Sequence, residues 1–336
     1  MSAADGCIAV LWIAATLYAV LGGADFGAGF WDLIAGGEEA GRRPRALIDR
    51  ALSPVWEANH VWLIFTIVVL WTAFPAAFSP IFSTLWIPLA LAALGIVVRG
   101  ADFAFREASE GVRVKRVYGA LFGVASLLTP FFLGAALGGI AAERVPADGA
   151  GDLVTSWANP AGVVVGLLAV AICAELAAVY LVTEARHAGD EAMERYFTMR
   201  ALVAGVAAAI LAVAGIAILE DEAPYVGDRL LDEALPLVLI AAALTVLALG
   251  AIAARRPLGT RLAAAGSIVA VTWAWGVAQW PYLLPQSLTV DAAAGDSTTL
   301  TWVLVVFIIA LVVVVPALVL LFTLAQKGRL EGGTPL

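Results

Sequence analysis

The feature that most constrains this chain is a series of apolar runs, each about as long as a bilayer is thick. A transmembrane helix needs roughly 20 apolar residues, and 62% of the 336 residues are hydrophobic while only 14% are charged. Soluble domains are about a quarter charged, so a soluble enzyme is excluded. The runs are continuous rather than alternating, which favours helices over a membrane barrel. We expect an all-α polytopic membrane protein that forms one integral membrane domain over residues 1–336.

Nine segments qualify as membrane spans. They cover approximately residues 7–26, 55–75, 82–104, 117–141, 160–184, 199–219, 235–254, 261–282 and 300–325. Ser53-Pro54 and Asn159-Pro160 each pair a capping residue with a proline at the first helical position, so they predict two helix starts. Pro130 and Pro316 fall inside spans, where we expect them to kink the helix rather than end it.

The basic residues predict the orientation of these spans. If nine spans alternate, sixteen of the nineteen Lys and Arg residues fall on one side, only Arg144 and Arg229 fall on the other, and Arg99 lies within a span. Because cytoplasmic loops are enriched in Lys and Arg, we expect an N-out, C-in topology. The sixteen are Arg42, Arg43, Arg45, Arg50, Arg106, Arg113, Lys115, Arg116, Arg186, Arg195, Arg200, Arg255, Arg256, Arg261, Lys327 and Arg329.

Charge and terminal composition exclude other classes. The net charge of −8 argues against nucleic acid as a partner, since phosphate binding needs clustered cations. No Lys or Arg precedes the first apolar run, so a cleaved signal peptide is not predicted. Cys7 and Cys173 both lie in apolar runs, without the spacing of a zinc site or a disulfide framework.

Five ionisable residues lie inside spans, near what the predicted topology makes their cytoplasmic ends. They are Asp25, Glu57, His60, Arg99 and Asp102. Glu57 and His60 are three residues apart, as are Arg99 and Asp102, so each pair shares a helix face. Such groups cost roughly 2.5–3.5 kcal/mol each in a membrane and are usually paired or functional. The cluster is therefore either a proton-conducting or ion-binding site open to the cytoplasm, or a set of charge pairs that ties three helices together.

Glu175 differs from this cluster because it lies near the middle of the fifth span, with no charged residue within a turn. It is either a proton relay or a buried neutral acid. The chain has only two His and three Met, the axial ligands that b-type hemes require, so it cannot hold several hemes by itself. It carries no phosphate loop, dinucleotide fingerprint or nucleophile motif.

Several motifs carry a family resemblance. The first span ends in Gly22-Gly23-Ala24-Asp25-Phe26-Gly27-Ala28-Gly29, and the second opens with Ser53-Pro54-Val55-Trp56-Glu57-Ala58-Asn59-His60-Val61-Trp62-Leu63-Ile64. Further matches follow in order: Ala73-Phe74-Pro75, Arg99 with Asp102, Asn159-Pro160, and Trp280-Pro281-Tyr282-Leu283-Leu284-Pro285 before the Ser/Thr-rich segment 297–301. Over nearly its whole length the chain resembles subunit II of the cytochrome bd quinol oxidases.

The resemblance implies a fold of two four-helix bundles plus one peripheral helix, paired with subunit I in the bacterial cytoplasmic membrane. In that family subunit I carries all three hemes, of types b and d, and the quinol site. The complex oxidises quinol and reduces dioxygen to water with protons taken from the cytoplasm. We therefore expect no cofactor, metal or catalysis on this chain alone. A small single-span accessory subunit and a bound lipid or structural quinone are further expected partners.

The resemblance also implies roles for individual residues. Subunit II scaffolds subunit I and is thought to help deliver protons; Glu57 holds the acid position of the P-x-W motif, and Asp25 is the other acidic match. His60, Asp102 and Glu175 are further proton-transfer candidates, with Arg99 as a structural charge partner. Many members have Asp at the position of Glu57 and Gln or Glu at that of His60. The motifs do not distinguish ubiquinol from menaquinol as the donor.

A secondary transporter or ion antiporter is the alternative function. It predicts acids that bind a cation near the membrane midplane, between inverted repeats. Here the charges gather at one end of the spans, and the sequence shows no convincing inverted repeat. This distribution favours the oxidase subunit.

Overall fold

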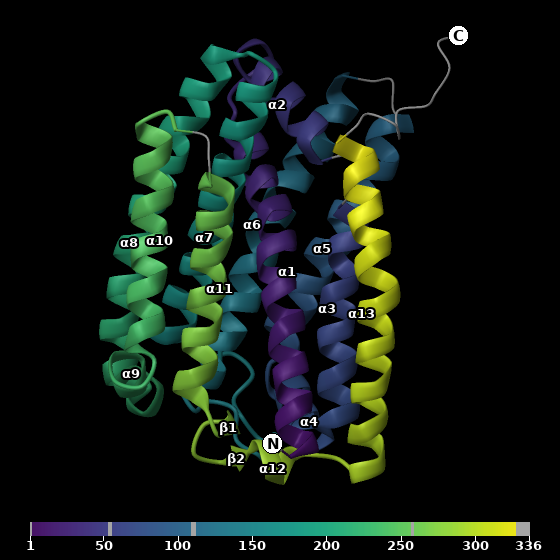
Figure 1. Ribbon diagram of the computed structural model, residues 1–336, viewed down its shortest axis with the longest axis vertical. Coiled ribbons are helices and arrows are strands. Elements are labelled where there is room, and N and C mark those ends of the chain that lie inside the picture. Colours follow the sequence, from purple (N-terminus) through teal and green to yellow (C-terminus); the bar gives the residue numbers. More distant parts are fainter. Residues whose placement is uncertain (1, 53–55, 109–111, 257–258, 327–336) are drawn as a thin grey trace.

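The computed structural model describes residues 2–52, 56–108, 112–256 and 259–326. Long helices dominate it and run side by side along one axis (Figure 1). They are α1 (Ala3–Leu33), α3 (Trp56–Ala73), α5 (Trp86–Ala108), α6 (Val112–Ala141), α7 (Pro160–His187), α8 (Glu191–Glu222), α10 (Leu235–Ala253), α11 (Thr260–Gln279) and α13 (Ser297–Gln326). The shorter elements are α2 (Glu38–Leu52), α4 (Pro75–Thr84), α9 (Pro224–Leu231), α12 (Val290–Ala293), β1 (Tyr282–Leu284) and β2 (Leu288–Thr289).

The all-α membrane class is confirmed, whereas the count of nine spans stays a prediction. Among the described residues, seven helices are long and apolar enough to cross a bilayer, and the pair formed by α3 and α4 would make eight. The third predicted span, 82–104, corresponds to α5, whose described apolar part covers only Trp86–Ala101. Each of the nine predicted segments overlaps one long helix, but composition and length support seven to eight spans.

Two helix boundaries show how the local sequence determines where a helix begins or ends. Asn159 caps α7 as predicted, because its side chain accepts a hydrogen bond of 2.8 Å from the backbone N–H of Gly162. The second span was predicted to reach residue 75, but α3 ends at Ala73, and α4 leaves it at an angle of 120°. Pro75 stands at the first turn of α4, where its missing N–H is tolerated. The predicted start at Ser53-Pro54 lies outside the described residues.

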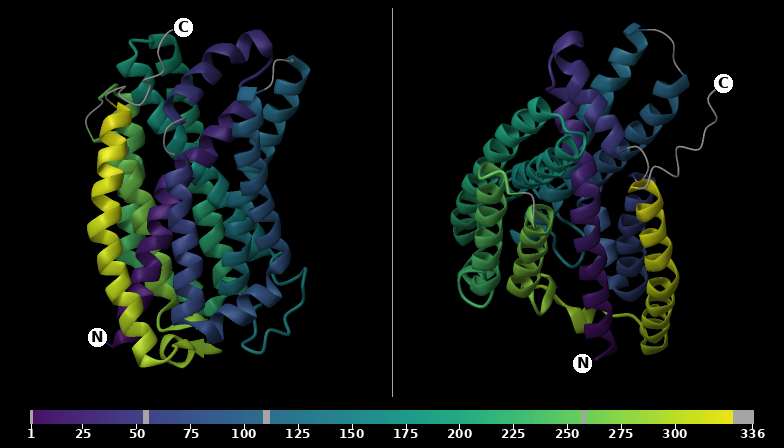
Figure 2. Two further views of the ribbon diagram at one scale, coloured as in Figure 1. Left: turned by 90° about the vertical axis from the view of Figure 1, so that its right-hand side faces the viewer. Right: turned by 45° about the horizontal axis from the view of Figure 1, so that its top comes forward.

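The long helices pack as two groups. In the first, α1 packs against α3 and α6, and α5 packs against α6; in the second, α7 packs against α8, and α10 packs against α11. The groups meet where α7 contacts α1 and α6, while α13 lies beside α1 and α3 (Figure 2). Exposed side chains such as Val312 and Val313 on α13 and Val246 on α10 leave apolar surface for lipid or a partner.

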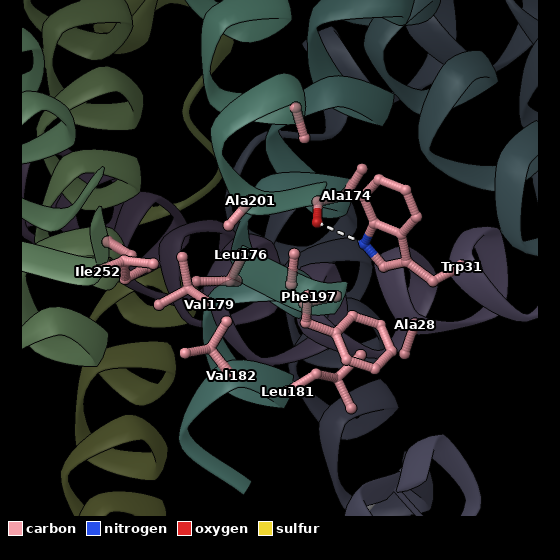
Figure 3. Packing of buried hydrophobic residues seen from close by; sticks show 14 of the residues in the cluster. Ala28, Trp31, Ala174, Leu176, Val179, Leu181, Val182, Phe197, Ala201 and Ile252 are labelled. Carbon is pink, nitrogen blue, oxygen red and sulfur yellow. Dashed lines mark hydrogen bonds between the residues drawn. The ribbon is translucent and has the colours of Figure 1, made fainter. Parts of the chain in front are cut away.

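The seam between the groups is an apolar core. Ala28 and Trp31 of α1 pack with Leu176 and Val179 of α7 and Phe197 of α8 (Figure 3). The indole N–H of Trp31 donates a 2.8 Å hydrogen bond to the carbonyl of Ala174. Because that donor is satisfied, the indole can be buried without an unpaired polar atom.

The two ends of the helix array differ. At one end, here termed the hairpin end, lie the N-terminus of α1 and the antiparallel pair β1–β2, in which Tyr282 pairs with Thr289 (Figure 1). At the other, the α2 end, α2 packs Leu47 and Ile48 inward and exposes Arg42 and Arg50. The hairpin falls where the eighth span was predicted to end, since α11 stops at Gln279.

Candidate functional site

Three polar residues from three helices meet inside the first helix group. Asp25 of α1 is 2% exposed, Asn59 of α3 is 3% exposed, and Arg99 of α5 is completely buried. The amide of Asn59 donates to the Asp25 carboxylate at 2.5 Å and to the carbonyl of Leu21 at 3.3 Å. The structure thus brings together Asp25 and Arg99, two residues that the sequence singled out at distant positions.

Arg99 reaches the backbone of Asp25 rather than its carboxylate. Its Nη2 donates to the carbonyl oxygen of Asp25 at 2.9 Å. The guanidinium carbon also lies 4.9 Å from the ring centroid of Phe26 and 5.1 Å from that of Phe122. Aromatic faces attract a cation that has left water, so the two rings provide part of the stabilisation that solvent would otherwise give.

His60 lies next to this group on an aromatic wall. Its ring is 6.0 Å from that of Tyr18 and 6.1 Å from that of Phe26, edge to face in both cases. The two rings also meet each other at 6.2 Å. His60 therefore contacts Phe26, the residue that follows Asp25, directly.

Glycines on α1 allow the neighbouring helices to come this close. A Cβ at Gly27 would lie 1.8 Å from the backbone oxygen of Cys173 on α7. One at Gly29 would lie 2.1 Å from the hydroxyl of Ser126 on α6. Small residues permit such approaches between membrane helices, so the Gly-rich run lets α6 and α7 pack closely against the turn of α1 that follows Asp25.

The remaining predicted site residues divide into two kinds. Glu57 and Asp102 lie on the described backbone of α3 and α5, but their side chains lie outside the described residues. Glu175 is 8% exposed on α7, where its neighbours Ala174 and Leu176 belong to the apolar seam. No salt bridge links Glu175 to another described residue, so it stands apart from the Asp25 group.

Two parts of the site were not predicted as site residues. Asn59 belongs to the P-x-W motif. An amide two residues from an acid within a membrane span is a signal that could have identified it as a site residue. Asp32, 4% exposed, accepts a 2.8 Å ion-pair bond from Nε of Arg45 on α2. Because Arg45 also donates to the carbonyl of Gly36 at 2.8 Å, it attaches α2 to the end of α1.

The donor atoms of the described residues do not fit a resident metal or heme. Among the residues that the structure describes, no three His, Cys, Asp or Glu side chains form a group that could hold a metal ion. His60 lies on α3 among aromatic rings, whereas His187 is the last residue of α7 and Met199 on α8 is 62% exposed. A heme needs axial ligands that converge. That the chain alone binds none stays a prediction.

Comparisons with known proteins identify the fold and the family. The sequence model for cytochrome bd terminal oxidase subunit II matches residues 5–325. The structure is similar to a chain of the bd oxidase from Geobacillus thermodenitrificans, with a TM-score of 0.80 and 26% identity over 96% of this chain and 98% of that one.

Curated relatives agree with this. The chain is 21% identical over 336 residues to the putative cytochrome bd menaquinol oxidase subunit II of Bacillus subtilis (strain 168), covering 96% of this chain and 95% of that protein. It is 31% identical to that organism's cytochrome bd ubiquinol oxidase subunit 2, over 38% of this chain and only 36% of the relative. The cytochrome bd-I ubiquinol oxidase subunit 2 of Escherichia coli (strain K12) is 25% identical over 49% of this chain and 44% of that protein.

These matches favour the oxidase subunit over the transporter alternative, because the family match spans almost all of the chain and the solved structure shares its fold. This multi-pass membrane chain belongs to the family of cytochrome bd terminal oxidase subunit II.

Proposed function

We propose that the chain is the non-heme subunit of a quinol-oxidising terminal oxidase. In this proposal it scaffolds a heme-bearing subunit I and helps deliver cytoplasmic protons for the reduction of dioxygen to water. The hemes b and d and the quinol site belong to subunit I, and the donor is ubiquinol or menaquinol. A single-span accessory subunit and a bound lipid or structural quinone complete the proposed partners.

The hydrogen bond between Asn59 and the buried Asp25 is the observation that carries the proton-delivery proposal. A carboxyl group inside a membrane protein is costly and usually functional. This one is bonded to α3 and lies beside Arg99. Glu57 occupies the first turn of α3, at the α2 end, and His60 follows it by three residues. The proposed path begins at the α2 end and uses Glu57, His60 and Asp25.

Substitution of Glu57 tests the proposal. Gln keeps the size and hydrogen bonding but cannot ionise, whereas Asp keeps the acid. Glu57→Gln should slow quinol-driven oxygen consumption with heme content retained, while Glu57→Asp stays active. Proton-transfer groups typically contribute 10²–10⁴ in rate, and the loss would be smaller if subunit I provides a parallel path.

Heme content separates the relay from a purely structural role. If Glu57 only pairs with another charge, Glu57→Gln should lower assembly and heme content instead of turnover per heme. Normal turnover and proton uptake in a correctly assembled Glu57→Gln oxidase would refute the relay. Asp25→Asn, in the interior of the same group, is the companion variant.

We further propose nine spans with the N-terminus outside and the C-terminus inside. Two observations support this: basic residues such as Arg186, Arg195 and Arg261 lie on helix termini at the α2 end, and Arg229 lies on α9 at the hairpin end (Figure 1). Topology reporters fused after Gly189 or Arg256 should then report cytoplasm. Reporters in segments 146–152 or 220–233 should report the outside, and a reversed pattern would overturn the orientation.

A further inference from the structure

The hydrogen-bonding groups around Arg99 do not balance among the described residues. Arg99 is fully buried, and its Nη2 has the Asp25 carbonyl as acceptor. Its Nε and Nη1 are also buried, and neither has an acceptor there. A guanidinium carries five N–H donors in a fixed fork, and aromatic faces supply attraction but no lone pair directed at an N–H. The fork therefore needs at least one further acceptor.

A second unpartnered group lies against the same turn of α1. Ser126 on α6 is 1% exposed, and its hydroxyl oxygen has no hydrogen-bond partner among the described residues. A Cβ at Gly29 would lie 2.1 Å from that oxygen. In an α-helix the carbonyl of residue 25 faces the N–H of residue 29. Arg99 of α5 therefore bonds to one end of this turn of α1, and Ser126 of α6 lies beside Gly29 at its other end.

A neighbouring hydroxyl on α6 has a hydrogen-bond partner, whereas that of Ser126 has none among the described residues. Thr129 lies on the same helix, three residues after Ser126, and is also completely buried. Its hydroxyl donates to the carbonyl of Ala125 at 2.9 Å, within its own helix. Ser126 makes no such bond, so its hydroxyl remains able to accept from one group and donate to another.

We propose that Arg99 and Ser126 form an internal hydration site between α1, α5 and α6, in which ordered water accepts from the guanidinium and bonds to the Ser126 hydroxyl. Water is favoured over a small anion because the formal charges of Arg99 and Asp25 already cancel. Buried waters typically bond about three otherwise unsatisfied polar groups, and this site offers two N–H donors and one hydroxyl.

The inference deepens the proposed proton-handling role, because it extends the Asp25 group toward α6 with a molecule that can carry protons. Water bound there would give the buried cluster an exchangeable hydrogen-bonding partner beyond Asn59. The absence of a side chain at Gly29 is a requirement of the site, since any Cβ would occupy the position of the Ser126 hydroxyl.

The test is a density map of the assembled oxidase at a resolution that shows ordered water. We expect a peak within hydrogen-bonding distance of both Arg99, at Nε or Nη1, and the Ser126 oxygen. Ser126→Ala should abolish or displace the peak, while Thr129→Ala, which removes a hydroxyl that is already satisfied, should leave it. A map without the peak, or a peak that survives Ser126→Ala unmoved, would overturn the site.

A second preparation distinguishes water from a halide. If bromide replaces chloride throughout purification, the peak should keep the height of ordered water, and a peak that strengthens would overturn the assignment to water. These readouts do not depend on turnover. If the peak is present but Glu57→Gln leaves proton uptake unchanged, the proton-delivery proposal fails while the hydration site stands.

Discussion

The two helix groups treat charge differently. Between α1, α3, α5 and α6, an aspartate and an arginine are buried together and hydrogen-bonded to an amide and a backbone carbonyl. In the group of α7, α8, α10 and α11, cations meet acids near the α2 end, as in Arg261 with Glu184 and Arg186 with Glu194. The side chains of these two pairs keep 13–35% of their surface exposed, so solvent screens them in part, whereas the fully buried charge of Arg99 must be compensated inside the protein.

The buried polar residues of the first group are not required for packing, so they indicate a task other than folding. An apolar interior such as the one around Phe197 and Val179 would suffice to pack either group. The first group instead keeps Asp25 and Arg99 in a position that costs stability. Glu175 is the exception in the second group, a single buried acid without a charged partner among the described residues. The comparison therefore supports the proposal that proton chemistry takes place in the first group.

Replacement of one arginine in each group should give the largest difference in stability between the two groups. Arg99→Met leaves Asp25 without its buried cation, and such a loss costs about 3–5 kcal/mol. Arg261→Met removes the partner of Glu184. The side chains of this pair are 25% and 35% exposed, so solvent screens their interaction and the loss should be smaller. Heme content and thermal stability of the assembled complex should fall strongly in the first variant and slightly in the second.

A double-variant cycle decides whether Asp25 is the cause. Asp25→Asn added to Arg99→Met should recover part of the lost stability, since the orphaned charge is gone. The corresponding pair, Glu184→Gln with Arg261→Met, should show little coupling. Equal losses from Arg99→Met and Arg261→Met would contradict the contrast between a buried and a peripheral cation.

Contact between the two groups should be the next most sensitive feature. Gly27→Ala places a Cβ against the backbone oxygen of Cys173, which cannot rotate away. Overpacking typically costs 1–3 kcal/mol, and we expect roughly the upper end of that range, measured as a lower yield of assembled complex. The control is Gly250→Ala on α10, where a Cβ meets nothing within 4 Å. If Gly250→Ala were as damaging as Gly27→Ala, close approach would not be the reason for Gly27.

Much of this could be predicted from sequence because hydropathy and charge report depth in the membrane. The positions of the long helices, the Asn159 cap and the convergence of Asp25 with Arg99 all follow from such patterns. These patterns do not predict which residue faces which neighbour. That depends on how each helix is rotated about its axis. The rotation decides that Arg99 bonds to a carbonyl instead of a carboxylate, and that Asn59 reaches Asp25. That rotation is set by packing at residues such as Gly27, whose neighbour is 146 positions away.

The hairpin after α11 was missed for a related reason. Its strands contain two and three residues, too short for a period-two pattern to stand out from the end of an apolar span. Leu283 and Leu284 are buried, so the segment reads as a continuation of the helix. Pro281 and Pro285 were the local signals of a turn.

The smallest expected effect is a pH dependence at the α2 end of the second group. Asp190 caps α8 by accepting from the N–H of Met193 and forms an ion pair with Arg43 of α2 at 2.9 Å. The hydrogen bond from Met193 and the interaction with Arg43 lower the pKa of the Asp190 carboxyl below its usual value. Stability from this carboxylate is therefore complete above the ordinary pKa of aspartate. It is lost as the pH falls toward the lowered pKa of the folded protein.

Asp190→Asn keeps a side-chain oxygen for the cap but removes the charge, so its melting temperature should be slightly lower than wild type at neutral pH. The difference should shrink as the medium becomes acidic, because wild-type Asp190 then loses its charge as well. Thermal melting of the complex across that range measures the change, with Glu191→Gln as the control because it removes an exposed acid beside the cap. A deficit in Asp190→Asn that stays constant with pH would mean that the charge of Asp190 contributes nothing to the contact between α2 and α8. The attachment of α2 to the second group would then not depend on this ion pair, which would sharpen the contrast with the buried pair of the first group.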